Sequence, residues 1–112
     1  MKISVEQKQG VTFLYPKGKI TIGKGDVALR EAVNDALGSG QKNILVDLKD
    51  VTTMDSSAIG EMVSAYTSVS NQGGGLKLLN LPPKVNDILQ ITQLVTVFEI
   101  YDDEAEAIAS FG

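Results

Sequence analysis

The segment that decides the fold spans residues 43–60 and reads Asn43-Ile44-Leu45-Val46-Asp47-Leu48, Lys49-Asp50-Val51-Thr52-Thr53-Met54, Asp55-Ser56-Ser57-Ala58-Ile59-Gly60. Its first six residues are almost continuously apolar and end at charged residues, which is typical of a short strand buried on both faces. Residues 49–54 predict a loop. Apolar residues then return at spacings of three and four, which predicts a helix with one buried face: Ala58, Ile59, Met62, Val63, Ala65, Tyr66 and Val69. The segment therefore predicts a central strand, a loop and a helix.

The start of this helix is the first candidate site. Asp55 is suited to cap the helix, and Ser56 and Ser57 place two hydroxyls in its first turn. First-turn N–H groups lack helical acceptors and carry the positive end of the helix dipole, so an anion is favourable there. This predicts either a bound phosphate or a phosphate attached to a serine. Asp and Ser are also the residues that any helix N-terminus prefers, so capping alone explains the same pattern.

Composition limits the classes of function. The chain has 112 residues, enough for one domain, and contains no cysteine and no histidine, so thiol nucleophiles, Cys/His zinc sites and a Ser-His-Asp triad are excluded. The formal net charge is −4, and the ten basic residues are scattered along the chain, so we expect no direct nucleic-acid partner. No long apolar run or signal-peptide pattern is present, so we expect a cytoplasmic protein without membrane contact.

The rest of the chain predicts alternating strands and helices. Residues 3–15 predict a hairpin that turns at Gln9-Gly10, and residues 19–22 a brief strand. A helix capped by Asp26 and ended by Gly38 follows, and then a strand over 76–79. The next predicted helix starts at Pro82 and buries Val85, Ile88, Leu89 and Ile91. A strand over 96–100 leads to a closing helix, which is capped by Asp102-Asp103 and buries Ala105, Ile108 and Phe111. We expect a single α/β domain over residues 1–112. Its mixed, mostly parallel sheet of four to five strands is flanked by four helices and has an antiparallel N-terminal hairpin.

Three other motifs suggest chemistry that their context does not support. Residues 18–25 nearly match a phosphate-binding P-loop, but Gly25 stands where a hydroxyl should bind Mg²⁺, so a glycine-rich turn is the better interpretation. Residues 39–42 match the Ser-x-x-Lys pattern of some acyl-enzymes but lie in a predicted loop. Asp47, Asp50 and Asp55 are better explained as a strand end, a turn and a cap than as a metal site.

Residues 47–60 resemble the signature of STAS-domain anti-sigma factor antagonists, in which a strand and loop lead into Met, Asp, Ser, Ser or Thr, Gly, an apolar residue and Gly. The resemblance extends over nearly the whole chain, including residues 73–78 and 89–94. It implies the STAS fold, a mixed sheet flanked by helices, and a regulatory protein that is not an enzyme.

The resemblance also implies a partner-switching mechanism. The unphosphorylated protein would bind an anti-sigma factor that is also a serine kinase and so release a sigma factor. The kinase would phosphorylate Ser56, and a serine phosphatase would reverse the modification. ATP belongs to the kinase, so no cofactor is expected. The expected partner footprint around Ser56 is Asp55, Ser57, Ile59, Gly60, Met62 and Thr21.

Two departures from the family pattern affect this footprint. Ala58 stands where the family usually has glycine, and the acidic loop after the second strand is replaced by Gly18-Lys19-Ile20-Thr21. The alternative function is a constitutive STAS interaction module in which the serines only cap the helix. An enzyme is a more distant alternative, because the sequence lacks a convincing pair of nucleophile and base.

Overall fold

The computed structural model describes residues 3–21, 23 and 25–111, apart from the side chain of Asp26. Its main sheet has five strands in the order β1-β2-β4-β6-β7. These strands are β1 (Ile3–Lys8), β2 (Val11–Pro16), β4 (Asn43–Asp47), β6 (Gly75–Leu79) and β7 (Ile100–Tyr101). β1 pairs with β2 in antiparallel orientation, and the other neighbours are parallel. The structure thus confirms the predicted mixed sheet, with residues 43–47 as its central strand.

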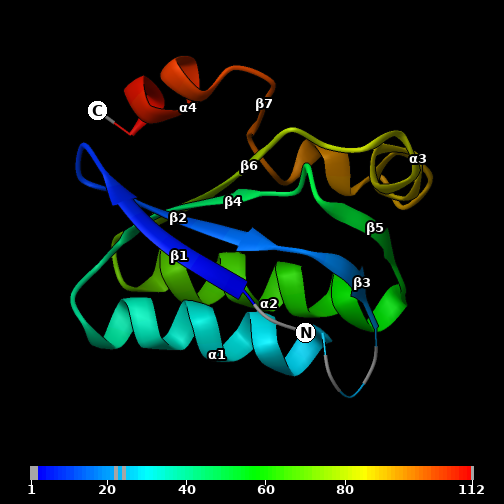
Figure 1. The fold of residues 1–112 in the computed structure, drawn as a ribbon, viewed down its shortest axis with the longest axis horizontal. Helices are drawn as coiled ribbons and strands as arrows, with labels where there is room; N and C mark the ends of the chain where they lie inside the picture. The colour runs from blue at the N-terminus through cyan, green and yellow to red at the C-terminus, as the bar shows by residue number, and fades with distance from the viewer. Residues whose placement is uncertain (1–2, 22, 24, 112) are drawn as a thin grey trace.

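A second, two-stranded sheet continues the first. β3 (Gly18–Ile20) follows β2 and β5 (Val51–Met54) follows β4, and the two pair in parallel. A hydrogen bond from Gly18 N to Asp50 O, 2.9 Å long, joins the chain where both strands leave the main sheet. The two short strands bend over the end of the helical layer (Figure 1). They therefore place the residues that follow β5 at one end of the molecule.

Helices cover both faces of the main sheet. α1 (Gly25–Gly38) and α2 (Ser56–Asn71) lie on one face, α4 (Glu104–Ser110) lies on the other, and α3 (Pro83–Ile91) lies beside β5 (Figure 1). The larger core forms between the sheet and α1 and α2, and includes Leu14, Leu29, Val46 and Met62. A smaller core under α4 contains Val11, Phe13, Leu45, Leu79 and Ala107. β4 contributes to both cores, which explains its continuous apolar sequence.

The N-terminal hairpin forms as predicted. Gln9 and Gly10 have φ angles of 52° and 80°, and Lys8 pairs with Val11 across this two-residue turn. Two successive positive φ angles match the right-handed twist of the flanking strands, which is why glycine is favoured at the second position.

Two predictions of buried residues and one strand prediction were wrong. Ile91 is 82% exposed, because it lies two positions from the buried Leu89 and so on the opposite side of α3. Ala105 is exposed for the same reason, since α4 buries Ala107. The strand predicted over residues 96–100 is reduced to Ile100–Tyr101, and Leu94–Thr96 form a short 3₁₀-helix. After this helix, Phe98 packs edge-to-face against Tyr66, with 5.4 Å between the ring centroids.

A buried lysine connects α4 to the sheet. Lys77, in β6, is 8% exposed, and its Nζ donates to both the carbonyl oxygen and the Oγ of Ser110 at 2.9 Å. Glu99 lies 3.3 Å from the same ammonium group, and the ring of Phe111 lies 4.6 Å from it. The charge is thus paired and hydrogen-bonded, which offsets the cost of its burial.

The turn before β6 requires glycine. An alanine Cβ at Gly74 would overlap the backbone carbonyl of Lys42, whereas a Cβ at Gly60 on α2 would meet no atom within 4 Å. We therefore expect Gly74→Ala to lower the free energy of unfolding by about 1–3 kcal/mol. Gly60→Ala should raise it by about 0.5–1 kcal/mol through helix propensity. Urea denaturation of both variants would measure the difference, and equal stabilities would contradict this account of the turn.

Candidate functional site

The β3–β5 pair fixes the position of the first residue before α2. Ile20 pairs with Met54, and Asp55 N donates to Ile20 O at 3.2 Å. The sequence prediction of a loop over residues 49–54 was therefore wrong for Val51–Met54, which form β5. The strand-forming residues Val51, Thr52 and Thr53 were the signal that could have revealed it. The pairing of β5 with β3 thus fixes the position of the N-terminus of α2.

Asp55 caps α2 as predicted. Its backbone is extended, with φ −96° and ψ −179°, and its Oδ1 accepts from Ala58 N at 3.0 Å. The helical ladder begins with Ile59 N donating to Asp55 O at 3.1 Å. The N–H groups of Ser56 and Ser57 precede this ladder, so they are aligned with the positive end of the helix dipole.

The first turn of α2 presents small polar residues at the surface. Ser56 and Gly60 are exposed, and Asp55, Ser57 and Thr21 are half-buried. Because Ile20 O bonds Asp55 N, Thr21 lies next to this turn. The structure therefore brings together these five predicted site residues, and it leaves the Ser56 side chain accessible to solvent.

The other two predicted footprint residues face inward. Met62 is 1% exposed and belongs to the larger core, so its prediction as a contact residue is corrected. Ile59 is 7% exposed and also packs in that core, which leaves only a small part of it at the surface. The methyl of Ala58 is fully buried, so it adds packing to the core and no bulk to the surface.

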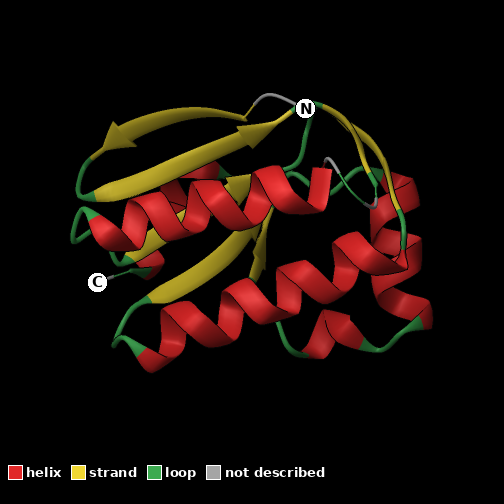
Figure 2. Ribbon diagram, turned by 90° about the horizontal axis from the view of Figure 1, so that it is seen from below, coloured by secondary structure: helices red, strands yellow, loops and turns green. Residues whose placement is uncertain are grey.

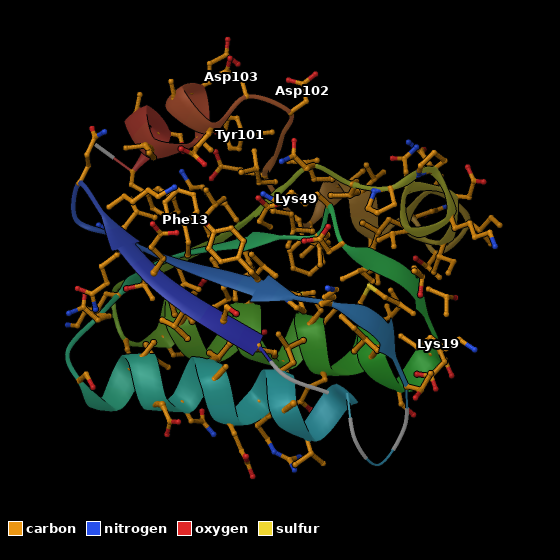
Figure 3. The ribbon with its side chains drawn as sticks, in the orientation of Figure 1. Phe13, Lys19, Lys49, Tyr101, Asp102 and Asp103 are labelled. Carbon is orange, nitrogen blue, oxygen red and sulfur yellow. The ribbon has the colours of Figure 1, made fainter. Side chains whose placement is uncertain are left out.

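One cation lies close to this turn. Lys19 is exposed and pairs across β3 and β5 with Thr53, two residues before Asp55. Figure 3 shows Lys19 at the end of the molecule where α2 begins, with its side chain directed away from the core. On the neighbouring surface of α2, Glu61 lies 3.9 Å from Arg30 of α1. Lys19 thus places a positive charge on the strand beside β5, at a position where the family pattern has an acid.

The competing motifs have structural explanations. In the P-loop-like segment, a Cβ on Gly25 would lie 2.7 Å from Ile20 Cα, so glycine allows α1 to start against β3. Ile22 and Lys24 of this segment lie outside the described residues. Asp47 ends β4 and accepts from Lys49 N at 3.1 Å and Asn80 Nδ2 at 3.3 Å. Among the described residues, no group of three or more acidic side chains could hold a metal ion.

The fold and this surface define a small α/β domain that displays a capped helix N-terminus. The chain belongs to the STAS domain family, whose profile matches residues 2–107. In the described part of the chain, no helix has the length and hydropathy of a membrane-spanning segment.

Individual relatives agree with this assignment. The chain is 33% identical to the anti-sigma-B factor antagonist of Bacillus subtilis, with 89% of this chain and 92% of the relative covered. It is 27% identical to the anti-sigma F factor antagonist of Paenibacillus polymyxa, with 96% and 92% covered. A crystal structure of the Thermotoga maritima protein TM1081 superimposes with a TM-score of 0.89 at 28% identity, covering 97% of this chain and 93% of that one.

The cap of α2 can be tested separately from function. Asp55→Ala removes the acceptor for Ala58 N, so we expect the free energy of unfolding to fall by about 1 kcal/mol. Asp55→Asn keeps an acceptor oxygen, so its free energy of unfolding should fall much less. Urea titrations followed by far-ultraviolet circular dichroism would compare the two, and an equal loss in both variants would show that the hydrogen bond is not the cause.

Proposed function

We propose that this chain is an anti-sigma factor antagonist that binds an anti-sigma factor serine kinase through the first turn of α2 and is switched off by phosphorylation of Ser56. The observation that carries the proposal is the exposed Ser56 side chain, one residue after a cap that does not use it. A serine phosphatase would restore the binding form. The relatives named as anti-sigma factor antagonists support the antagonist function in this proposal.

The position of Ser56 makes its modification compatible with the fold. A phosphate adds about −1.5 to −2 charges at neutral pH, and it would lie at the positive end of the α2 dipole. The cap is made by Asp55, and the buried residues of this turn are Ala58 and Ile59, so a group on Ser56 disturbs neither. SpoIIAA provides a parallel: its unphosphorylated and phosphorylated structures match this fold with TM-scores of 0.71 and 0.74.

The effect of the phosphate would therefore fall on the docked partner. The partner surface would pack against Ser56, Gly60 and the half-buried Thr21. Its shape and charge would therefore match the neutral hydroxyl of Ser56 and the missing side chain at Gly60. A dianion that is desolvated in that interface costs several kcal/mol unless a cation pairs with it, and this cost is enough to move a two-state equilibrium from mostly bound to mostly free. Charge at one hydroxyl would thus control association and leave the domain folded.

We expect Ser56→Glu to lower affinity for the cognate anti-sigma factor by about tenfold or more, because a carboxylate replaces a neutral group in the interface. The Tm should change little. Ser56→Ala should bind as wild type does but should not be released when the kinase is supplied with ATP. Capture from native cells would identify the anti-sigma factor, and isothermal titration calorimetry with the purified pair would give the affinities.

The matched control is Ser70→Ala, an exposed serine in the last turn of α2 that lies outside the expected footprint and should retain both binding and release. Mass spectrometry of the released chain should find the phosphate on Ser56. Phosphate on Ser57 alone would contradict the assignment of the site. Equal binding and equal release by wild type, Ser56→Ala and Ser56→Glu would instead favour a constitutive interaction module.

A further inference from the structure

β1 is the outermost strand of the main sheet, at the edge opposite β7. Its six residues pair only with β2 among the described residues, and Figure 2 shows it at the rim with α1 running alongside the hairpin. In a hairpin closed by two residues, Lys8 and Val11 form a hydrogen-bonded pair, and such pairs alternate with non-bonded ones. The N–H and C=O groups of Ile3, Val5 and Gln7 therefore point away from β2 and are available to another strand.

A groove of about 340 Å³ runs beside this open edge, between β1 and α1. Its apolar lining includes Ile3 and Val5 from β1 and Ala28, Ala32 and Ala36 from α1. Val5 is 57% exposed, which is unusual for a β-branched residue whose side chain faces a helix. The small alanines keep the groove open, so a side chain from an added strand could pack against Val5.

The rim of the groove on α1 is acidic. Glu31 and Asp35 line it, are both exposed, and form no ion pair with any residue in the described part of the chain. They are one helical turn apart, which corresponds to about 6 Å along α1. Alternate residues of a strand are about 6.6 Å apart, so two basic side chains at alternate positions could each meet one carboxylate.

We propose that the β1 edge and this groove bind an extended segment of a partner protein that carries apolar residues and two basic residues on the same strand face. Backbone hydrogen bonds to Ile3, Val5 and Gln7 would add the segment to the sheet, and the groove with Glu31 and Asp35 would select its side chains. A second copy of this chain fits less well. The groove-facing residues of its own β1 include Ile3, Val5 and Gln7, none of which is basic.

This surface lies on β1 and α1 and is distinct from the first turn of α2, so the inference does not rest on the proposed function. The probe is a synthetic peptide, acetyl-Val-Thr-Lys-Thr-Lys-Thr-Val-amide, titrated into the ¹⁵N-labelled full chain. We expect amide shifts to concentrate in β1 and α1, with little change at Ser56. A peptide of the same composition with adjacent lysines places them on opposite strand faces and should bind more weakly.

Charge reversal tests the rim. Glu31→Lys combined with Asp35→Lys should raise the peptide Kd by about tenfold, because two attractions become repulsions. The matched control is Asp87→Lys combined with Asp102→Lys, which changes the net charge equally at exposed acids outside the groove and should leave the Kd unchanged. An equal loss of binding in both double variants would show nonspecific charge attraction and overturn the proposal.

Backbone methylation tests strand addition. N-methyl groups on the lysines block one edge of the peptide, and N-methyl groups on the threonines block the other, so only one of the two peptides should lose binding. The peptide that fails reports the orientation of the added strand. Undiminished binding of both peptides, an absence of shifts in β1 and α1 at the solubility limit, or a stable β1-mediated dimer of the chain alone in sedimentation experiments would each overturn the proposal.

Discussion

The hydrogen bond from Asp55 N to Ile20 O, 3.2 Å long, holds the candidate site in place. It is the last link of a parallel pair, β3 and β5, that leaves the main sheet and ends at the start of α2. Every other feature of the site depends on this junction: the extended backbone of Asp55, the cap on Ala58 N, and the outward position of Ser56. The sheet thus sets where the positive end of the α2 dipole meets solvent.

Along α2, burial separates the residues that pack the core from those that face solvent. Ala58, Ile59, Met62, Ala65 and Val69 supply the core, while Ser56 and Gly60 in the first turns face outward. Gly60 contributes nothing to packing, and glycine within a helix costs about 1 kcal/mol relative to alanine. Gly60 therefore leaves a surface without a side chain near the exposed hydroxyl of Ser56, at a cost in helix propensity, and this surface permits close approach by another molecule.

Sequence patterns predicted the elements whose signals are local. The continuous apolar run at residues 44–46 identified the central strand, and the Asp55 and Asp103 caps identified two helix starts. Several failures arose where the helical period was not followed along the whole helix. Ile91 was assigned to the buried stripe of α3, but the buried residues of that helix are Val85 and Leu89. Met62 was predicted both on the buried face of α2 and in the partner footprint, and its burial is the part that is confirmed.

The arrangement around Lys77 couples the end of the chain to the middle of the sheet. Its ammonium relies on the carbonyl and hydroxyl of Ser110 and on the ring of Phe111. Truncation before Ser110 would remove these three groups at once and leave the ammonium with its ion pair to Glu99, beside the small core that contains Phe13, Leu45 and Leu79. Such shortening would destabilise β6 itself, which pairs with the central strand, so the last turn of α4 solvates a charge that the sheet places in its interior.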